Sequence, residues 1–121
     1  AVDILEKLLK EQPQLSGVSK WLATLYQSAR LSEQAQHYYR QAIHWNPDDG
    51  ATHYLYAGML METGQTDKAI QQYREALHAL FDDANVHTDL AKAYIMTGDT
   101  DQAARHQQLA RHITQGKHRR R

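Results

Sequence analysis

The sequence predicts an all-α solenoid built from antiparallel helix pairs. Three observations lead to this fold class. The chain repeats every 34 residues, in consecutive windows that cover residues 16–49, 50–83 and 84–117. Within each window, apolar residues recur at the three- and four-residue spacing of a helix stripe, in two blocks separated by turn residues. One helix pair cannot bury both of its faces alone, so consecutive pairs are expected to stack.

Composition indicates one folded domain and excludes several classes of protein. Of the 121 residues, 41% are hydrophobic and 23% are charged, as in folded chains. The 14 basic and 14 acidic residues balance, which argues against a whole-domain binder of nucleic acid or anionic membranes. The absence of cysteine excludes a disulfide framework, a cysteine-ligated metal site and a thiol nucleophile. No apolar run approaches about 18 residues, so no membrane-spanning helix is expected.

The leading segment, residues 1–15, fits the second half of a further repeat and predicts a single helix without its own first-helix partner. Val2, Leu5 and Leu9 can pack on the first full window, but the other side of this short helix stays bare. Burying each apolar side chain is worth about 1.5–3 kcal/mol. We therefore expect either further repeats upstream or a homo-oligomer contact through this end. The residues expected at that contact are Ile4, Leu5 and Leu8.

Small residues are predicted at the closest helix contacts of the three full windows. With the places in each window numbered from 1, places 8, 20 and 27 are alanine in all three windows. These residues are Ala23, Ala57 and Ala91, then Ala35, Ala69 and Ala103, then Ala42, Ala76 and Ala110. A methyl side chain lets two helix backbones approach closely, and larger residues such as Tyr39 and Tyr73 fill the space beside them.

Turn residues separate the helices. Gly64 and Gly98 stand where a helix needs a left-handed C-terminal residue. The second helix of each window is expected to open on a hydroxyl residue that caps it. These residues are Ser32, Thr66 and Thr100. Aspartate-rich turns at residues 46–49 and 82–83 end the first two windows.

The last helix is expected to close the solenoid with a polar outer face. The residues of this face are Arg105, His106, Gln107, Gln108 and Arg111. Gly116 is expected to end the helix, and residues 118–121 form a basic tail. Such a tail is most often solvated, although clustered arginines also suit nucleic acid, acidic protein or anionic lipid.

The pattern resembles the tetratricopeptide repeat, and the resemblance covers residues 1–117. The residues that carry it are Leu22, Tyr26, Ala35, Tyr39, Ala42 and Pro47 in the first window and Gly64, Ala69, Tyr73 and Ala76 in the second. Departures are Ser19, His53 and His87 in place of tryptophan, alanine in place of glycine at place 8, and Phe81 in place of proline. The resemblance implies a right-handed α-solenoid that acts as a protein–protein interaction scaffold.

The resemblance also implies a concave groove, lined by the first helix of each window, that binds a peptide or partner protein. The residues expected to bind there are Lys20, Thr24, Gln27, Tyr54, Met61, Asn85, Thr88 and Lys92. Packing between neighbouring helices is the alternative for Met61, Ile95 and Met96. Binding of chaperone C-terminal tails is not expected, because only Lys20 matches the five residues that hold their carboxylate, and Asp89 has the wrong charge.

No catalytic, metal or cofactor site is expected, and no small-molecule substrate. Three of the eight histidines, His44, His78 and His112, share place 29, so stacked repeats hold them roughly 10 Å apart, too far to share one ion. At the end of a helix they favour the helix dipole. The sequence contains no glycine-rich phosphate loop and no nucleophile elbow. The compartment stays open between the cytoplasm and a bacterial periplasm.

Overall fold

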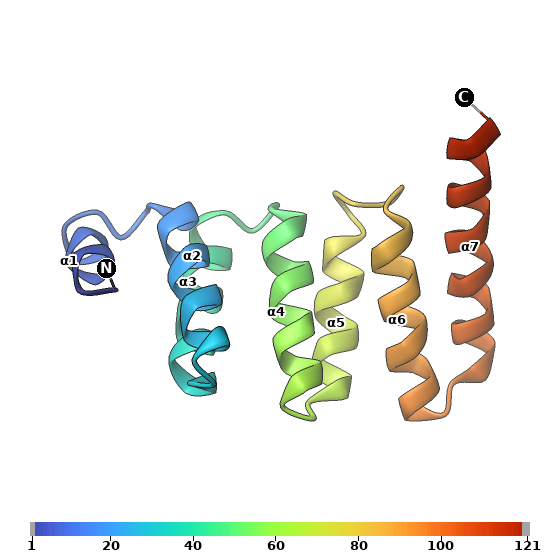
Figure 1. Ribbon diagram of the computed structural model, residues 1–121, viewed down its shortest axis with the longest axis horizontal. Helices are drawn as coiled ribbons and strands as arrows, with labels where there is room; N and C mark the ends of the chain where they lie inside the picture. The colour runs from blue at the N-terminus through green and yellow to red at the C-terminus, as the bar shows by residue number, and fades with distance from the viewer. Residues whose placement is uncertain (1, 120–121) are drawn as a thin grey trace.

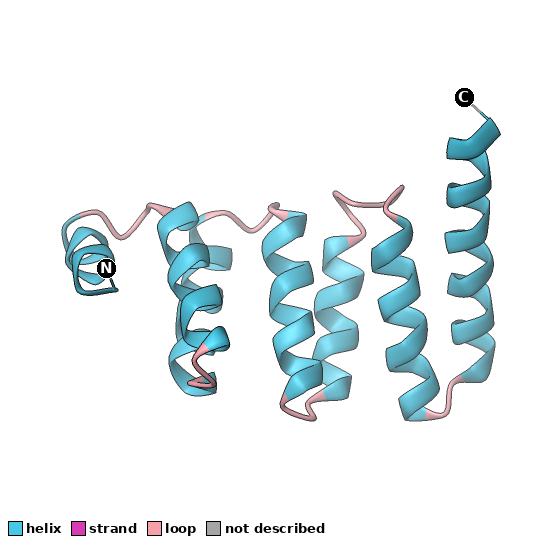
Figure 2. Cartoon of the chain, viewed as in Figure 1, coloured by secondary structure: helices cyan, strands magenta, loops and turns pink. Residues whose placement is uncertain are grey.

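The computed structural model of the chain describes residues 2–119, and side chains as far as residue 116. The basic tail expected at residues 118–121 therefore lies outside the described side chains. Within the described part, the chain forms helices and no strand. The helices are α1 (Val2–Glu11), α2 (Ser16–Ser28), α3 (Ser32–Trp45), α4 (Gly50–Glu62), α5 (Thr66–Ala76), α6 (Ala84–Thr97) and α7 (Thr100–Arg119). Short turns connect them (Figure 2).

The helices follow one another in a row from α1 at one end to α7 at the other (Figure 1). Each helix contacts the helix before it and the helix after it, and the densest contacts join α2 to α3, α4 to α5, and α6 to α7. α2 also contacts α4, so the first two pairs touch through their first helices as well. The predicted all-α solenoid is confirmed. No helix among residues 2–119 is long and apolar enough to cross a bilayer.

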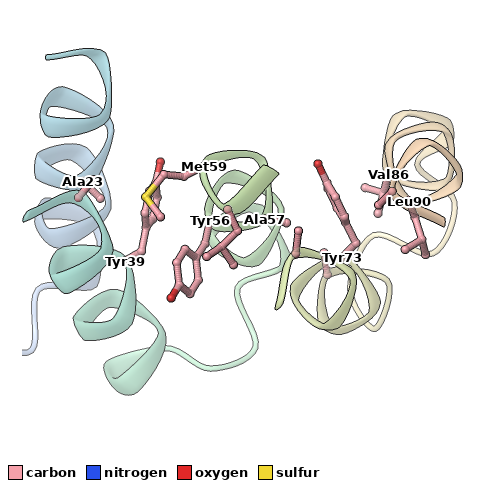
Figure 3. Packing of buried hydrophobic residues seen from close by; sticks show 13 residues of the cluster. Ala23, Tyr39, Tyr56, Ala57, Met59, Tyr73, Val86 and Leu90 are labelled. Carbon is pink, nitrogen blue, oxygen red and sulfur yellow. The ribbon is translucent and has the colours of Figure 1, made fainter. Parts of the chain in front are cut away.

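The nine repeated alanines lie in the core, and none of them is more than 8% exposed. Larger residues fill the space between the pairs (Figure 3). The ring of Tyr39 on α3 stacks on the ring of Tyr56 on α4, with centroids 5.5 Å apart. Both rings belong to one cluster that also contains Tyr73 of α5 and Leu90 of α6. Small residues at helix crossings and aromatic rings beside them therefore build a core that is continuous from α2 to α6.

Glycine occupies the left-handed turn between the two helices of the second and third pairs, as the sequence predicts. The φ angles of Gly64 and Gly98 are 78° and 84°. Arg30 holds the same place in the first window with a φ of 65°. A side chain in this conformation costs roughly 1–2 kcal/mol. The turn between α2 and α3 is therefore the strained one of the three.

Aspartates cap helices in this structure. The side chains of Asp49 and Asp83 accept hydrogen bonds from backbone N–H groups in the first turns of α4 and α6. Asp99 does the same for α7. The expectation that hydroxyl residues cap the second helices is wrong. These residues, Ser32, Thr66 and Thr100, are the first residues inside their helices.

α7 is the longest helix, and it continues through Gly116 to Arg119. The expectation that Gly116 ends this helix is wrong. A glycine inside a helix costs only about 1 kcal/mol relative to alanine, so its presence alone does not stop a helix.

Candidate functional site

The first helix of each pair leaves one stripe of side chains unburied. α2 buries Ser19, Leu22 and Ala23, and its residues at places 2, 5, 6, 9, 12 and 13 of the window are exposed or half-buried. The same places are exposed or half-buried in α4 and α6. We call this surface the first-helix face. Its residues are Gly17, Lys20, Trp21, Thr24, Gln27 and Ser28 of α2, Ala51, Tyr54, Leu55, Gly58, Met61 and Glu62 of α4, and Asn85, Thr88, Asp89, Lys92, Ile95 and Met96 of α6.

Polar contacts across the first-helix face join its three helices. The Gln27 amide nitrogen on α2 donates to the Glu62 carboxylate on α4, with 3.2 Å between the atoms. The Tyr54 hydroxyl on α4 donates to the Asp89 carboxylate on α6. Each contact links residues 35 positions apart, so a side-chain hydrogen bond joins α2 to α4 and another joins α4 to α6. The face is therefore one continuous surface held in a defined geometry.

Lys20 is tied into the structure. Its Nζ lies 3.2 Å from Oδ2 of Asp49, the residue that caps α4. Burial alone would raise the pKa of Asp49, but hydrogen bonds from Thr52 and Lys20 hold that pKa below its usual value. The ammonium group of Lys20 is thus engaged within the chain and fixes the start of α4.

Tyr54 and Gln27 also have structural partners. Burial, and then the bond to Asp89, raise the pKa of Tyr54, which keeps its hydroxyl a neutral donor. The ring of Tyr54 lies 5.8 Å from the ring of Tyr73 in the core. The Gln27 side chain accepts a 2.6 Å hydrogen bond from Tyr39 in addition to donating to Glu62.

Of the other expected binding residues, some are half-buried within the structure and some are exposed to solvent. Met61 is half-buried and packs against the core cluster. Thr24 is half-buried, and its hydroxyl donates to the backbone carbonyl of Trp21 with 2.7 Å between the oxygens. Asn85, Thr88 and Lys92 are exposed on α6.

Two exposed apolar residues of this face were missed by the sequence reasoning. Trp21 is 57% exposed and Leu55 is 36% exposed. They occupy place 6 of the first two windows, directly after Lys20 and Tyr54. A large apolar residue at the same place of two consecutive windows, outside the buried stripe, was the signal available in the sequence. Ile95 and Met96 on α6 are also exposed.

The described residues hold no cluster of three or more histidine, aspartate or glutamate side chains that could bind a metal ion. The first-helix face instead combines exposed apolar side chains with hydrogen-bonded polar groups. Such a combination suits contact with another polypeptide.

Solved structures of MamA are similar to this chain. One crystal structure of MamA superposes with a TM-score of 0.88 at 17% sequence identity, over 95% of this chain and 67% of that chain. A second has a TM-score of 0.90 at 18% identity, over 98% of this chain and 64% of that chain. A structure titled MamA AMB-1 has a TM-score of 0.85 at 23% identity, over 95% and 63%. This chain thus spans about two thirds of their length, and the likeness is one of fold.

A sequence profile described as the tetratricopeptide repeat matches residues 28–88 and 60–116, which together make up more than half of the chain. No curated protein matches the chain in sequence. The family and the fold support a protein-interaction scaffold as the general role. The family resemblance predicted from the sequence is confirmed, and the chain belongs to the tetratricopeptide repeat family.

Proposed function

We propose that the chain binds an extended segment of a partner protein along the first-helix face, with Trp21 and Leu55 as apolar anchors. The exposure of Trp21 carries this proposal, because more than half of a large apolar side chain meets water on a surface that its neighbours hold rigid. Tryptophan is enriched among the residues that contribute most to binding energy. Helices that are already held in place by their neighbours also lose little conformational entropy when a partner binds.

The charges of the face favour an apolar partner segment with few charges of its own. Lys20 is paired with Asp49, Glu62 accepts from Gln27, and Asp89 accepts from Tyr54. Lys92 adds one exposed cation on α6. The face carries two lysines and two carboxylates, so its charges balance and binding is expected to depend weakly on salt concentration.

Replacing both anchors by alanine should weaken binding at least about tenfold, which is the usual effect of removing buried interface anchors. The ligand is a peptide selected from a random displayed library on the immobilised chain, and titration calorimetry measures its affinity. Both side chains are exposed, so the melting temperature of the Trp21→Ala/Leu55→Ala variant should stay close to that of the wild type.

Phe81→Ala is the matched control, because Phe81 is 64% exposed in the turn between α5 and α6, away from the first-helix face. Its affinity should equal that of the wild type. An unchanged affinity of the double variant, or an equal loss in the Phe81 variant, would place the binding site elsewhere.

A second candidate function is self-association through α1. Leu9 is buried against the rest of the chain, while Ile4 is 73% exposed on the same helix. Leu5 and Leu8 are half-buried beside it. α1 contacts α2, so this stripe lies at the end of the row of helices (Figure 1). A second copy that covers it would bury apolar surface worth about 25 cal/mol per Å².

Sedimentation velocity over a range of protein concentrations tests self-association. The wild type should shift toward a dimer as its concentration rises, and Ile4→Lys should remove the shift, because a charge on the apolar face must be desolvated in the dimer. Ile95→Lys, which changes an exposed isoleucine on α6, should behave as the wild type. A wild type that remains monomeric at every concentration contradicts this candidate.

A further inference from the structure

Two buried histidines occupy equivalent places in consecutive helix pairs. His53 lies on α4 and His87 on α6, and the ring of each is hydrogen-bonded through both nitrogens. The Nε2 atom of His53 lies 2.8 Å from the carbonyl oxygen of Pro47, and that of His87 lies 2.9 Å from the carbonyl oxygen of Phe81. A carbonyl only accepts, so Nε2 carries a proton in both rings. Each histidine thus ties its helix to the turn that precedes it.

The Nδ1 atom of each ring meets a side chain from the second helix of the same pair. For His53 the partner is Oε1 of Gln72 on α5, at 2.7 Å. For His87 the partner is Nδ1 of His106 on α7, at 2.9 Å. Each arrangement connects a turn, a first helix and a second helix. We call them the α4 clamp (Pro47, His53 and Gln72) and the α6 clamp (Phe81, His87 and His106).

The two clamps differ in how they respond to a proton. Rotation of the Gln72 amide presents either its oxygen or its NH₂ group to His53, so the α4 clamp keeps its hydrogen bond whether His53 is neutral or protonated. In the α6 clamp, neutral His87 accepts at Nδ1, and the Nδ1–H group of His106 must donate to it. A first added proton can sit on Nε2 of His106. A second would place two N–H donors opposite each other.

The surroundings of His106 disfavour protonation of its ring, even by a single proton. Burial, then His87, Arg105 on the same helix and Arg74 on α5, lower the pKa of His106. The ring of Tyr94 on α6 stacks against His106 with centroids 5.8 Å apart.

A cavity of about 780 Å³ beside the α6 clamp is lined from α5, α6 and α7. Its titratable and charged lining residues are Arg74, Glu75, His78, His87, Tyr94, Arg105 and His106. Glu75 is the carboxylate among them, and it lies 3.9 Å from His78. A positive charge on the α6 clamp therefore lies in a cavity lined by two guanidinium groups and one carboxylate, which makes it unfavourable.

The expectation that His106 belongs to a solvated outer face of α7 is wrong, because its ring is half-buried and packs on α6.

We propose that the α6 clamp is a proton-operated latch, which holds α6 and α7 on the turn after α5 near neutral pH and loosens on acidification, while the α4 clamp stays closed. The direction follows from proton linkage. A histidine whose pKa is lower in the folded chain than in the unfolded chain binds fewer protons when folded. The stability it supports is full above the ordinary pKa of about 6.5 and is lost as the pH falls below that value.

Exchanging the two clamp chemistries tests the latch. His106→Gln gives the α6 clamp the glutamine of the α4 clamp, and Gln72→His gives the α4 clamp a second histidine. Urea unfolding is measured at about pH 7.5 and about pH 5.5, on either side of the histidine range. Between these conditions, the unfolding equilibrium constant of the wild type should rise several-fold more than that of His106→Gln, and that of Gln72→His should rise most. Hydrogen exchange should show loss of protection in α6 and α7 of the wild type before α2 and α3.

An identical pH dependence in the wild type and His106→Gln overturns the latch, as does an equal loss of protection in all helix pairs. If His106→Gln does not fold, NMR titration of the His106 ring in the wild type decides the question. A His106 ring that takes up its proton at or above the ordinary pKa of about 6.5 also overturns it.

Discussion

Replacing Tyr39 by alanine should lower the free energy of unfolding by about 3–5 kcal/mol, the range for removing a buried aromatic ring. Tyr39 is fully buried on α3. Its ring stacks on Tyr56 of α4, and its hydroxyl donates to the Gln27 side chain on α2. One side chain thus joins three helices at the junction between the first two pairs (Figure 3). The alanine variant leaves a cavity there and deprives Gln27 of its donor.

Tyr39→Phe separates the ring from the hydroxyl. This variant keeps the packing and should lose only about 0.5–1.5 kcal/mol, the net value of one hydrogen bond. Burial raises the pKa of Tyr39 to about 12, so the hydroxyl stays neutral and the difference between the two variants should not change between about pH 6 and pH 9. Urea unfolding monitored by circular dichroism measures both losses. Equal losses in the two variants would show that the ring contributes nothing beyond its hydroxyl.

The fold could be predicted because its determinants are local and periodic. Alanine at fixed places specifies close helix contacts without knowledge of the partner helix, and glycine at a helix end specifies a left-handed turn. The expected capping residues lie one residue too far along the chain to cap their helices. Ser32 and Thr66 look like helix caps in sequence, but they begin their helices. A serine or threonine that precedes a helix as its cap cannot be told from one that is the first residue of the helix by sequence pattern alone.

The candidate site could be predicted only in part, because its details depend on contacts between pairs. Lys20 was expected to bind a partner, yet Asp49 lies beside it from 29 residues further along the chain. His106 was expected in a solvated cap, yet it meets His87 on the preceding helix. Neither contact follows from the spacing within one helix. The family pattern puts other residues of α2 on the binding side, so it does not predict Trp21, which lies on the exposed stripe of α2.

Replacing Ala57 by leucine should lower the free energy of unfolding by about 1–3 kcal/mol, because a well-packed crossing has no room for three more carbon atoms. Ala57 is fully buried on α4 and lies in the same cluster as Tyr56, Tyr73 and Leu60. Ala104→Leu is the matched control, since Ala104 is exposed on α7 and the longer side chain meets water there. Thermal and urea unfolding should show no loss for the control beyond about 0.5 kcal/mol.

The position of Ala57 in the central pair makes its substitution informative about the whole solenoid. In a row of stacked repeats, stability is the sum of terms from each repeat and from each junction between neighbours. The pair formed by α4 and α5 contacts the preceding pair between α3 and α4 and the following pair between α5 and α6, so overpacking its crossing disturbs two junctions. Ala91 lies in the pair formed by α6 and α7, whose junction with a neighbouring pair is the one between α5 and α6. Ala57→Leu should therefore broaden the unfolding transition more than Ala91→Leu. Transitions of equal breadth in the two variants would contradict a stability that depends on the junctions between neighbouring repeats.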